Sequence, residues 1–151
     1  MLNKILNNKY LLLLFRLFLG FIFVYASVSK ISDPENFSQA IYNYKLLPLS
    51  LINIFAIVLP WIELVAGILL IFGISVKENS VLLSTLVIIF ILAITISLFR
   101  GLDIDCGCFG TVDGAKVGIL KILENIGLLL LCIILIKFDS HFLSLASSSS
   151  E

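Results

Sequence analysis

Residues 81–99 read VLLSTLVIIFILAITISLF, and no side chain in this stretch is charged. A transmembrane helix needs about 20 mostly apolar residues to cross about 30 Å of hydrocarbon. Lipid offers the backbone no hydrogen-bond partners, so a segment that crosses it must form a helix. The stretch therefore predicts a membrane-spanning helix.

Three more apolar segments of similar length surround this one, at about residues 10–29, 49–75 and 117–136. Arg16 interrupts the first of them, and Glu63 lies inside the second. The sequence therefore predicts an all-α integral membrane protein that folds as a bundle of four transmembrane helices.

Composition supports a lipid environment for the whole chain. Hydrophobic residues make up 60% of it and charged residues 13%, with a mean hydropathy of +1.17. Soluble domains carry about 25% charged residues. The net charge is zero and no basic patch is visible, which argues against nucleic acid as a partner. We expect one membrane domain over residues 1–151, with a low-complexity, disordered tail at 147–151.

Two of the four segments have an alternative interpretation. The first could be a cleaved signal peptide, but its apolar run exceeds the usual 7–15 residues and contains Arg16. The fourth could be a surface helix, since it begins with polar residues. Its stretch 126–136 is uninterrupted, however, and Lys121 can extend its ammonium group towards water. A membrane span is favoured in both cases.

The topology follows from the number of spans and from the first positive charges. An even number of spans places both termini on one side. Lys4 and Lys9 precede the first span and favour cytoplasmic termini under the positive-inside rule. The segments at 30–48 and 100–116 would then face an oxidising, extracytoplasmic compartment.

The segment after the first span has a helical pattern of its own. Asp33 followed by Pro34 predicts a capped helix start. Phe37, Ile41 and Tyr44 recur at intervals of three to four residues and would form one apolar face. We expect a short interfacial helix here. It would either cover the end of the bundle or offer a docking surface.

Two thiols lie one residue apart in the stretch 100–110, which reads RGLDIDCGCFG. A disulfide between Cys106 and Cys108 would close a small, strained ring, and Gly107 would relax the backbone between them. Strained disulfides are readily reduced, which suits thiol–disulfide exchange. Arg100 would favour the thiolate form, while Asp103 and Asp105 would oppose it. Structural or incidental thiols, and a metal site, remain alternatives. Metal is the weakest, because structural zinc needs four ligands.

Charged residues inside the spans should face protein or water, because a charge at the centre of the bilayer costs at least about 2.5–3.5 kcal/mol. Antiparallel packing could bring Arg16 and Glu63 together as an ion pair that locks two helices. Alternatively, they could form a polar pocket for a quinone headgroup or a proton path. Glu124 and Asn125 either belong to the same polar interior or lie near the interface. Cys132 is most simply a small apolar residue that faces either lipid or another helix.

These motifs together resemble the MauE family of methylamine-utilisation membrane proteins, within the broader DoxX-like set. The resemblance covers nearly the whole chain in order. The matching elements are Arg16–Gly20 with Phe23, Ala26, Ser27 and Lys30; Asp33-Pro34 with Phe37, Ala40, Tyr44 and Leu46-Leu47-Pro48; Leu59–Glu63 with Gly67 and Gly73; and Arg100-Gly101 with Cys106–Gly110.

The resemblance implies a four-helix protein of the bacterial inner membrane. The family's named member is associated with maturation of an exported client, the small subunit of methylamine dehydrogenase, and is thought to act with a thioredoxin-like partner. DoxX-type relatives are linked to quinone-coupled oxidation of sulfur compounds. Carried over to this chain, Cys106 and Cys108 would be the redox pair, with Arg16, Glu63 and Arg100 in support.

One departure and one competing hypothesis accompany this resemblance. Relatives often carry an arginine before asparagine or aspartate early in the fourth helix, where this chain has Glu124-Asn125. The competing hypothesis is a non-catalytic membrane scaffold or maturation factor, whose cysteines hold the outer loop together. A small transporter is less favoured, because only the second span is broken by a proline.

Overall fold

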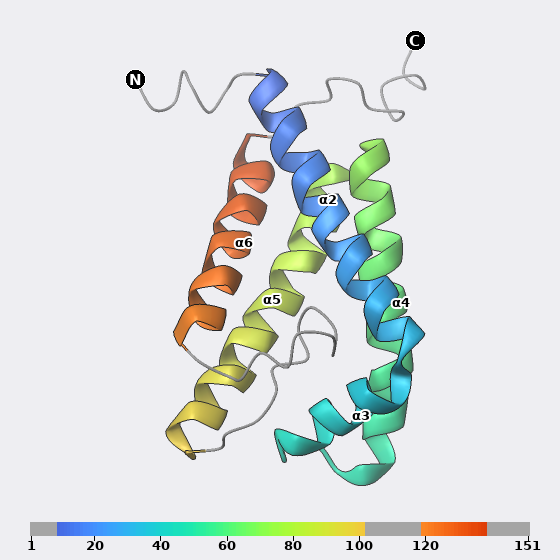
Figure 1. Ribbon diagram of the computed structural model, residues 1–151. Helices are drawn as coiled ribbons and strands as arrows, with labels where there is room; N and C mark the ends of the chain where they lie inside the picture. The colour runs from blue at the N-terminus through green and yellow to red at the C-terminus, as the bar shows by residue number, and fades with distance from the viewer. Residues whose placement is uncertain (1–8, 102–118, 139–151) are drawn as a thin grey trace.

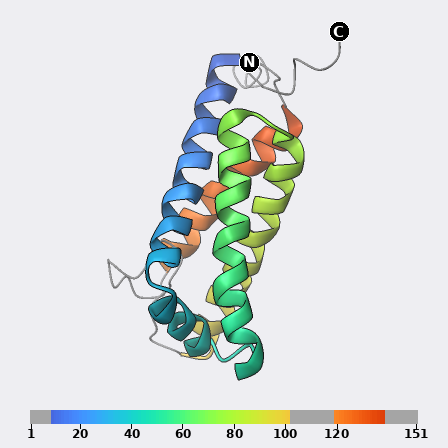
Figure 2. The ribbon, with the colours of Figure 1, turned by 90° about the vertical axis from the view of Figure 1, so that its right-hand side faces the viewer.

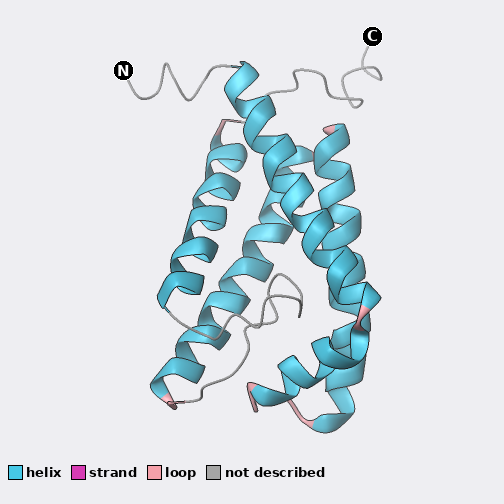
Figure 3. Ribbon diagram, viewed as in Figure 1, coloured by secondary structure: helices cyan, strands magenta, loops and turns pink. Residues whose placement is uncertain are grey.

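The computed structural model describes residues 9–101 and 119–138, and every regular element among them is helical (Figures 1 and 3). In chain order the helices are α2 (Lys9–Ser32), α3 (Pro34–Asn43), α4 (Leu49–Phe72), α5 (Val76–Phe99) and α6 (Ile119–Lys137). The prediction of an all-α membrane protein is confirmed for the described residues.

Three of these helices, α2, α4 and α5, are long and apolar enough to cross a membrane. Each has 24 residues, a length of about 36 Å at 1.5 Å per residue. The helix α6 has 19 residues and lies where the fourth span was predicted. The helix itself is therefore confirmed, and the count of four spans stays a prediction.

A tight turn joins α4 to α5 and changes two predicted boundaries. Gly73 adopts the left-handed conformation, with φ at 72°, and ends α4 at Phe72 rather than at residue 75. Glycine adopts this conformation without a steric penalty. The helix α5 then begins at Val76 rather than at residue 81. The side-chain amide of Asn79 donates to the carbonyl of Ile74 at 2.8 Å and ties the turn together.

Two helix pairs make up the bundle: α2 packs along α4, and α5 packs along α6 (Figures 1 and 2). The backbones of α2 and α4 approach closely at two glycines. A Cβ atom added to Gly67 would lie 3.1 Å from the carbonyl oxygen of Gly20, and one added to Gly20 would lie 3.0 Å from that of Gly67. Small residues at a crossing let membrane helices pack at short range.

The two ends of the bundle differ in what they contain. The start of α2, the turn between α4 and α5, and the end of α6 lie at one end (Figure 1). The helix α3, the end of α5 and the start of α6 lie at the other, which we call the α3 end. Gly101 and Ile119, which flank residues 102–118, are therefore both at the α3 end.

The predicted short helix after the first span is present as α3. The carboxylate of Asp33 accepts a hydrogen bond from a backbone N–H of the first turn at 3.2 Å, and Pro34 is the first helical residue. Phe37 and Tyr44 are buried, and Ile41 is half-buried. Because α3 packs against α4, this apolar face covers the end of the bundle.

Candidate functional site

A buried ion pair links α2 to α4. The Nζ atom of Lys30 lies 2.7 Å from Oε2 of Glu63, and each side chain is only 2% exposed. Hydrogen bonds between charged groups are roughly twice as strong as those between neutral groups. Removal of either partner would leave an uncompensated charge inside an apolar bundle.

Two aromatic rings flank the Lys30 ammonium group. Its nitrogen lies 5.2 Å from the ring centroid of Phe37, on α3, and 5.0 Å from that of Phe90, on α5. A cation within about 6 Å of a ring centroid is attracted by the π face, more strongly where water is excluded. The rings therefore stabilise the charge that Glu63 neutralises.

The helix α6 reaches the same place through Asn125, which is 3% exposed. Its side-chain nitrogen donates to the carbonyl of Lys121 at 2.8 Å. A cavity of about 20 Å³ separates Asn125 from the ion pair and is lined by Phe23, Ala26, Lys30, Glu63, Val87, Phe90, Asn125 and Leu128. With Phe37 of α3 beside the ammonium group, all five described helices meet at this site.

Sequence reasoning assigned Lys30 to the outer segment, whereas the structure buries it in α2. The helix extends to Ser32, three residues beyond the predicted end of the span. Phe23, Ala26, Ser27 and Lys30 are all buried and follow one another at intervals of three, one and three residues. That spacing marks one face of a helix and was the available signal.

The predicted ion pair between Arg16 and Glu63 is wrong. Glu63 binds Lys30 instead, and 14 residues separate Lys30 from Arg16 along α2, which is about 21 Å. Arg16 is buried, with 3% of its surface exposed, and lies nearer the start of α2 than its end. Arg16 and the Lys30–Glu63 pair therefore lie at different positions along the length of the bundle.

The predicted pocket for a quinone headgroup beside Glu63 does not fit the observed space. A cavity needs about 10–15 Å³ to hold one water molecule, so about 20 Å³ admits one. A six-membered quinone ring with two carbonyl groups is much larger. The pair's surroundings therefore suit a lock between helices better than a headgroup site.

Comparison with known proteins identifies the family of the chain. The family described as methylamine utilisation protein MauE matches residues 8–138. The chain belongs to the MauE family. MauE-family relatives include methylamine utilization protein MauE of Methylorubrum extorquens, 34% identical over 76% of this chain and 62% of the relative. The MauE protein of Paracoccus denitrificans is 32% identical over 74% of this chain and 60% of the relative. That of Methylophilus methylotrophus is 28% identical over 83% of this chain and 67% of the relative.

The match to these relatives covers only part of their length. The chain spans about three fifths of the length of the first two MauE relatives. No solved structure matches the chain. The names of these relatives place those proteins in methylamine utilisation.

The predicted redox pair of this MauE-family chain, Cys106 and Cys108 with Gly107 between them, lies outside the described residues. Arg100, at the end of α5, precedes that segment and is exposed. Its Nη1 atom donates to the carbonyl of Tyr44 at 3.4 Å, which connects the end of α5 to the end of α3. Arg100 thus takes part in closing the α3 end.

Of the remaining residues singled out from the sequence, some are buried in the bundle and others are exposed. Cys132 is fully buried in the apolar core, which agrees with the helix-facing alternative and not with the lipid-facing one. Asn125 belongs to the polar interior, while its neighbour Glu124 is exposed and pairs with Lys121 at 2.9 Å. Among the residues the structure describes, no group of three or more His, Cys, Asp or Glu side chains could hold a metal ion.

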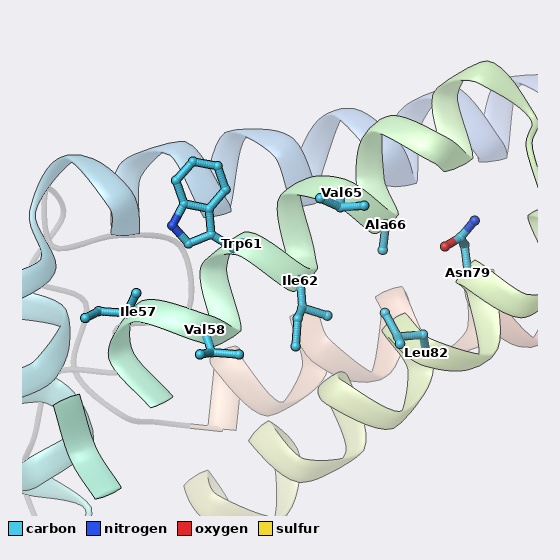
Figure 4. A pocket seen from close by; sticks show the side chains of 8 residues that line it. All are labelled: Ile57, Val58, Trp61, Ile62, Val65, Ala66, Asn79 and Leu82. Atoms are coloured by element: carbon cyan, nitrogen blue, oxygen red, sulfur yellow. The ribbon is translucent and has the colours of Figure 1, made fainter. Parts of the chain in front are cut away.

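A second concave feature lies between α4 and α5 (Figure 4). This groove has a volume of about 460 Å³ and is lined by Ile57, Val58, Trp61, Ile62, Val65, Ala66, Asn79 and Leu82. Both helices are long and apolar enough to span a bilayer. None of these side chains is ionisable, and the groove offers no acid–base chemistry.

Proposed function

We propose that this MauE-family protein takes part in thiol–disulfide exchange at a membrane surface, through Cys106 and Cys108. The observation that carries the proposal is the place of the two thiols in the chain. They lie one residue apart in the segment that joins α5 to α6, and both ends of that segment attach at the α3 end. In a chain with so few polar residues, a chemical role best explains two thiols one residue apart at a helix junction.

Covalent geometry supports a site near the α3 end. Five residues lead from Gly101 to Cys106, and an extended chain covers at most about 3.6 Å per residue. A linker of that length reaches at most about 18 Å from Gly101, so the proposed site belongs to this end of the bundle. Arg100 contributes a positive charge at this end, which favours the thiolate that attacks disulfides, while Asp103 and Asp105 between it and the pair act in the opposite direction.

The proposed exchange moves two electrons and conserves every sulfur. One thiolate of the pair attacks a disulfide of a thioredoxin-fold partner and forms a mixed disulfide. The second thiolate then attacks the mixed disulfide, which leaves a Cys106–Cys108 disulfide here and two thiols on the partner. In the reverse direction the pair oxidises the partner, which in turn oxidises an exported client. A membrane quinone is the class of acceptor that would reoxidise the pair, at a place other than the 20 Å³ cavity.

We also propose the topology that this exchange requires. The helix α6 would be the fourth span, since its 19 residues reach about 28 Å and it packs along α5. The protein would lie in the bacterial inner membrane with its termini in the cytoplasm. The cysteines would then face the extracytoplasmic side, where disulfides persist.

Trapping of the mixed disulfide tests the exchange. A variant with Cys108→Ser or Cys106→Ser keeps one attacking thiol and loses the resolving one. We expect one of them to accumulate a disulfide-linked adduct with a thioredoxin-fold protein, seen on non-reducing gels and identified by mass spectrometry. The double variant should form none. The matched control is Cys132→Ser, which removes a thiol fully buried in the core. If neither single variant forms an adduct while membrane levels stay normal, the exchange is excluded.

Labelling of intact cells with an impermeant thiol reagent tests the topology. In the Cys132→Ser background we expect Cys106 and Cys108, once reduced, to react before the cells are broken. Reaction only after disruption would show that the cysteines face the cytoplasm.

A second candidate function is that of a non-catalytic scaffold or maturation factor. The enclosed Lys30–Glu63 pair favours it, because the pair joins helices and leaves room for no organic ligand. Under this hypothesis, serine replacement of both outer cysteines would lower the amount of the protein itself and leave client thiols unaffected. Under the exchange hypothesis, the amount would stay normal and client disulfides would be lost.

A further inference from the structure

The cavity between α6 and the ion pair has both the size and the lining of a site for one water molecule. Its volume is about 20 Å³, above the 10–15 Å³ that one water requires. Three of its lining side chains are polar: Lys30 on α2, Glu63 on α4 and Asn125 on α6. Each is 3% exposed or less. Buried water molecules in proteins make about three hydrogen bonds, so the number of partners matches.

The ion pair retains hydrogen-bonding capacity for such a ligand. An ammonium group has three N–H donors, and a carboxylate has about four acceptor positions. The hydrogen bond between Lys30 and Glu63 Oε2 uses one of each. The two rings beside the ammonium offer π faces and no strong acceptor. Polar groups buried in an apolar interior cost free energy where this capacity stays unused.

We propose that one water molecule occupies this cavity and bridges Asn125 to the Lys30–Glu63 pair. The direct contact joins α2 to α4, while Asn125 belongs to the α5–α6 pair. The water therefore links the two helix pairs at the α3 end. It also fixes the early part of α6, shortly after residues 102–118. The proposal does not depend on thiol exchange, because its tests read out stability and structure.

A cavity-filling substitution tests the proposal through the sign of its effect. Val87→Ile adds one methyl group beside the cavity, where Val87 is 2% exposed. If a water molecule is bound, the added methyl group displaces it. Lys30, Glu63 and Asn125 then each lose one hydrogen bond, and the melting temperature in detergent micelles falls. In a Lys30→Met/Glu63→Met/Asn125→Leu background the cavity is apolar, and the same methyl group should raise the melting temperature.

Val76→Ile is the matched control, because Val76 is buried in α5 and does not line the cavity. Its effect should be equal in the two backgrounds. A rise in melting temperature for Val87→Ile in the otherwise natural chain would overturn the proposal, and so would an equal fall in both backgrounds. If the apolar background does not fold, a structure of the natural protein that resolves ordered water tests the proposal directly. We expect density for one water within 3.2 Å of polar atoms of all three side chains, and a cavity without such density would overturn the proposal.

Discussion

The motif at residues 60–63, which reads PWIE, contributes side chains to two opposite faces of α4. Pro60 and Glu63 point into the bundle and are buried, whereas Trp61 and Ile62 lie on the outer face and are 52% and 39% exposed. The inner face carries the ion pair and the glycine crossing with α2. The outer face borders the apolar groove with α5 (Figure 4). The comparison teaches that the first and fourth residues of this motif pack against protein, while the two residues between them face outward, towards lipid.

Glu63→Leu should have the largest effect, because it leaves the Lys30 charge buried without its carboxylate. Breaking a buried pair by removal of one partner costs about 3–5 kcal/mol. Unfolding in mixed micelles, followed by circular dichroism, measures this loss. The double variant Lys30→Met/Glu63→Leu should recover most of it, since well-packed apolar replacements of a buried pair are often neutral or stabilising. A single variant as stable as the natural protein would show that water reaches the inner face.

The glycine crossing should give the next largest effect. Gly67→Val places a branched side chain where even a Cβ atom would lie 3.1 Å from both the Gly20 carbonyl oxygen and a Val24 methyl group. We expect a loss of about 1–3 kcal/mol from overpacking, measured in the same unfolding assay. The control is Gly127→Val, because a Cβ atom at Gly127 meets nothing within 4 Å. Equal losses at both positions would mean that helix propensity, and not the close crossing, sets the cost.

The three long apolar helices and α3 could be predicted from sequence, because all of them depend on local patterns. Apolar length defines the spans, and the Asp33-Pro34 start with its periodic apolar residues defines α3. The partner of Glu63 could not be read in this way. Hydropathy treats Lys30 as the end of a span, and the choice between Lys30 and Arg16 depends on how far α2 slides along α4. The contact of Gly20 with Gly67 sets that register, and it is a tertiary feature.

Replacement of Tyr44 by phenylalanine should have a smaller effect on stability, and one that depends on pH only in alkaline solution. Burial raises the pKa of its phenol from 10.0 to about 12. The folded protein thus holds this proton more tightly than the unfolded chain does. Its contribution to stability is complete below pH 10 and is lost as the pH rises towards 12. Tyr44→Phe should therefore lose less stability than the natural protein between pH 8 and pH 11, as measured by melting temperature. Identical losses would show that Tyr44 ionises equally in both states.

Trp61→Leu should have the smallest effect, although Trp61 is only two residues from Glu63. Its side chain is 52% exposed on the face that meets lipid, and lipid tails are as apolar as leucine. Substitutions away from packed features usually change stability by about 0.5 kcal/mol or less. The unfolding assay used for Glu63→Leu measures both variants under one condition. A loss of more than about 2 kcal/mol, four times that usual change, would mean that the outer face of α4 packs against protein. The contrast between the two faces would then be one between two protein interfaces.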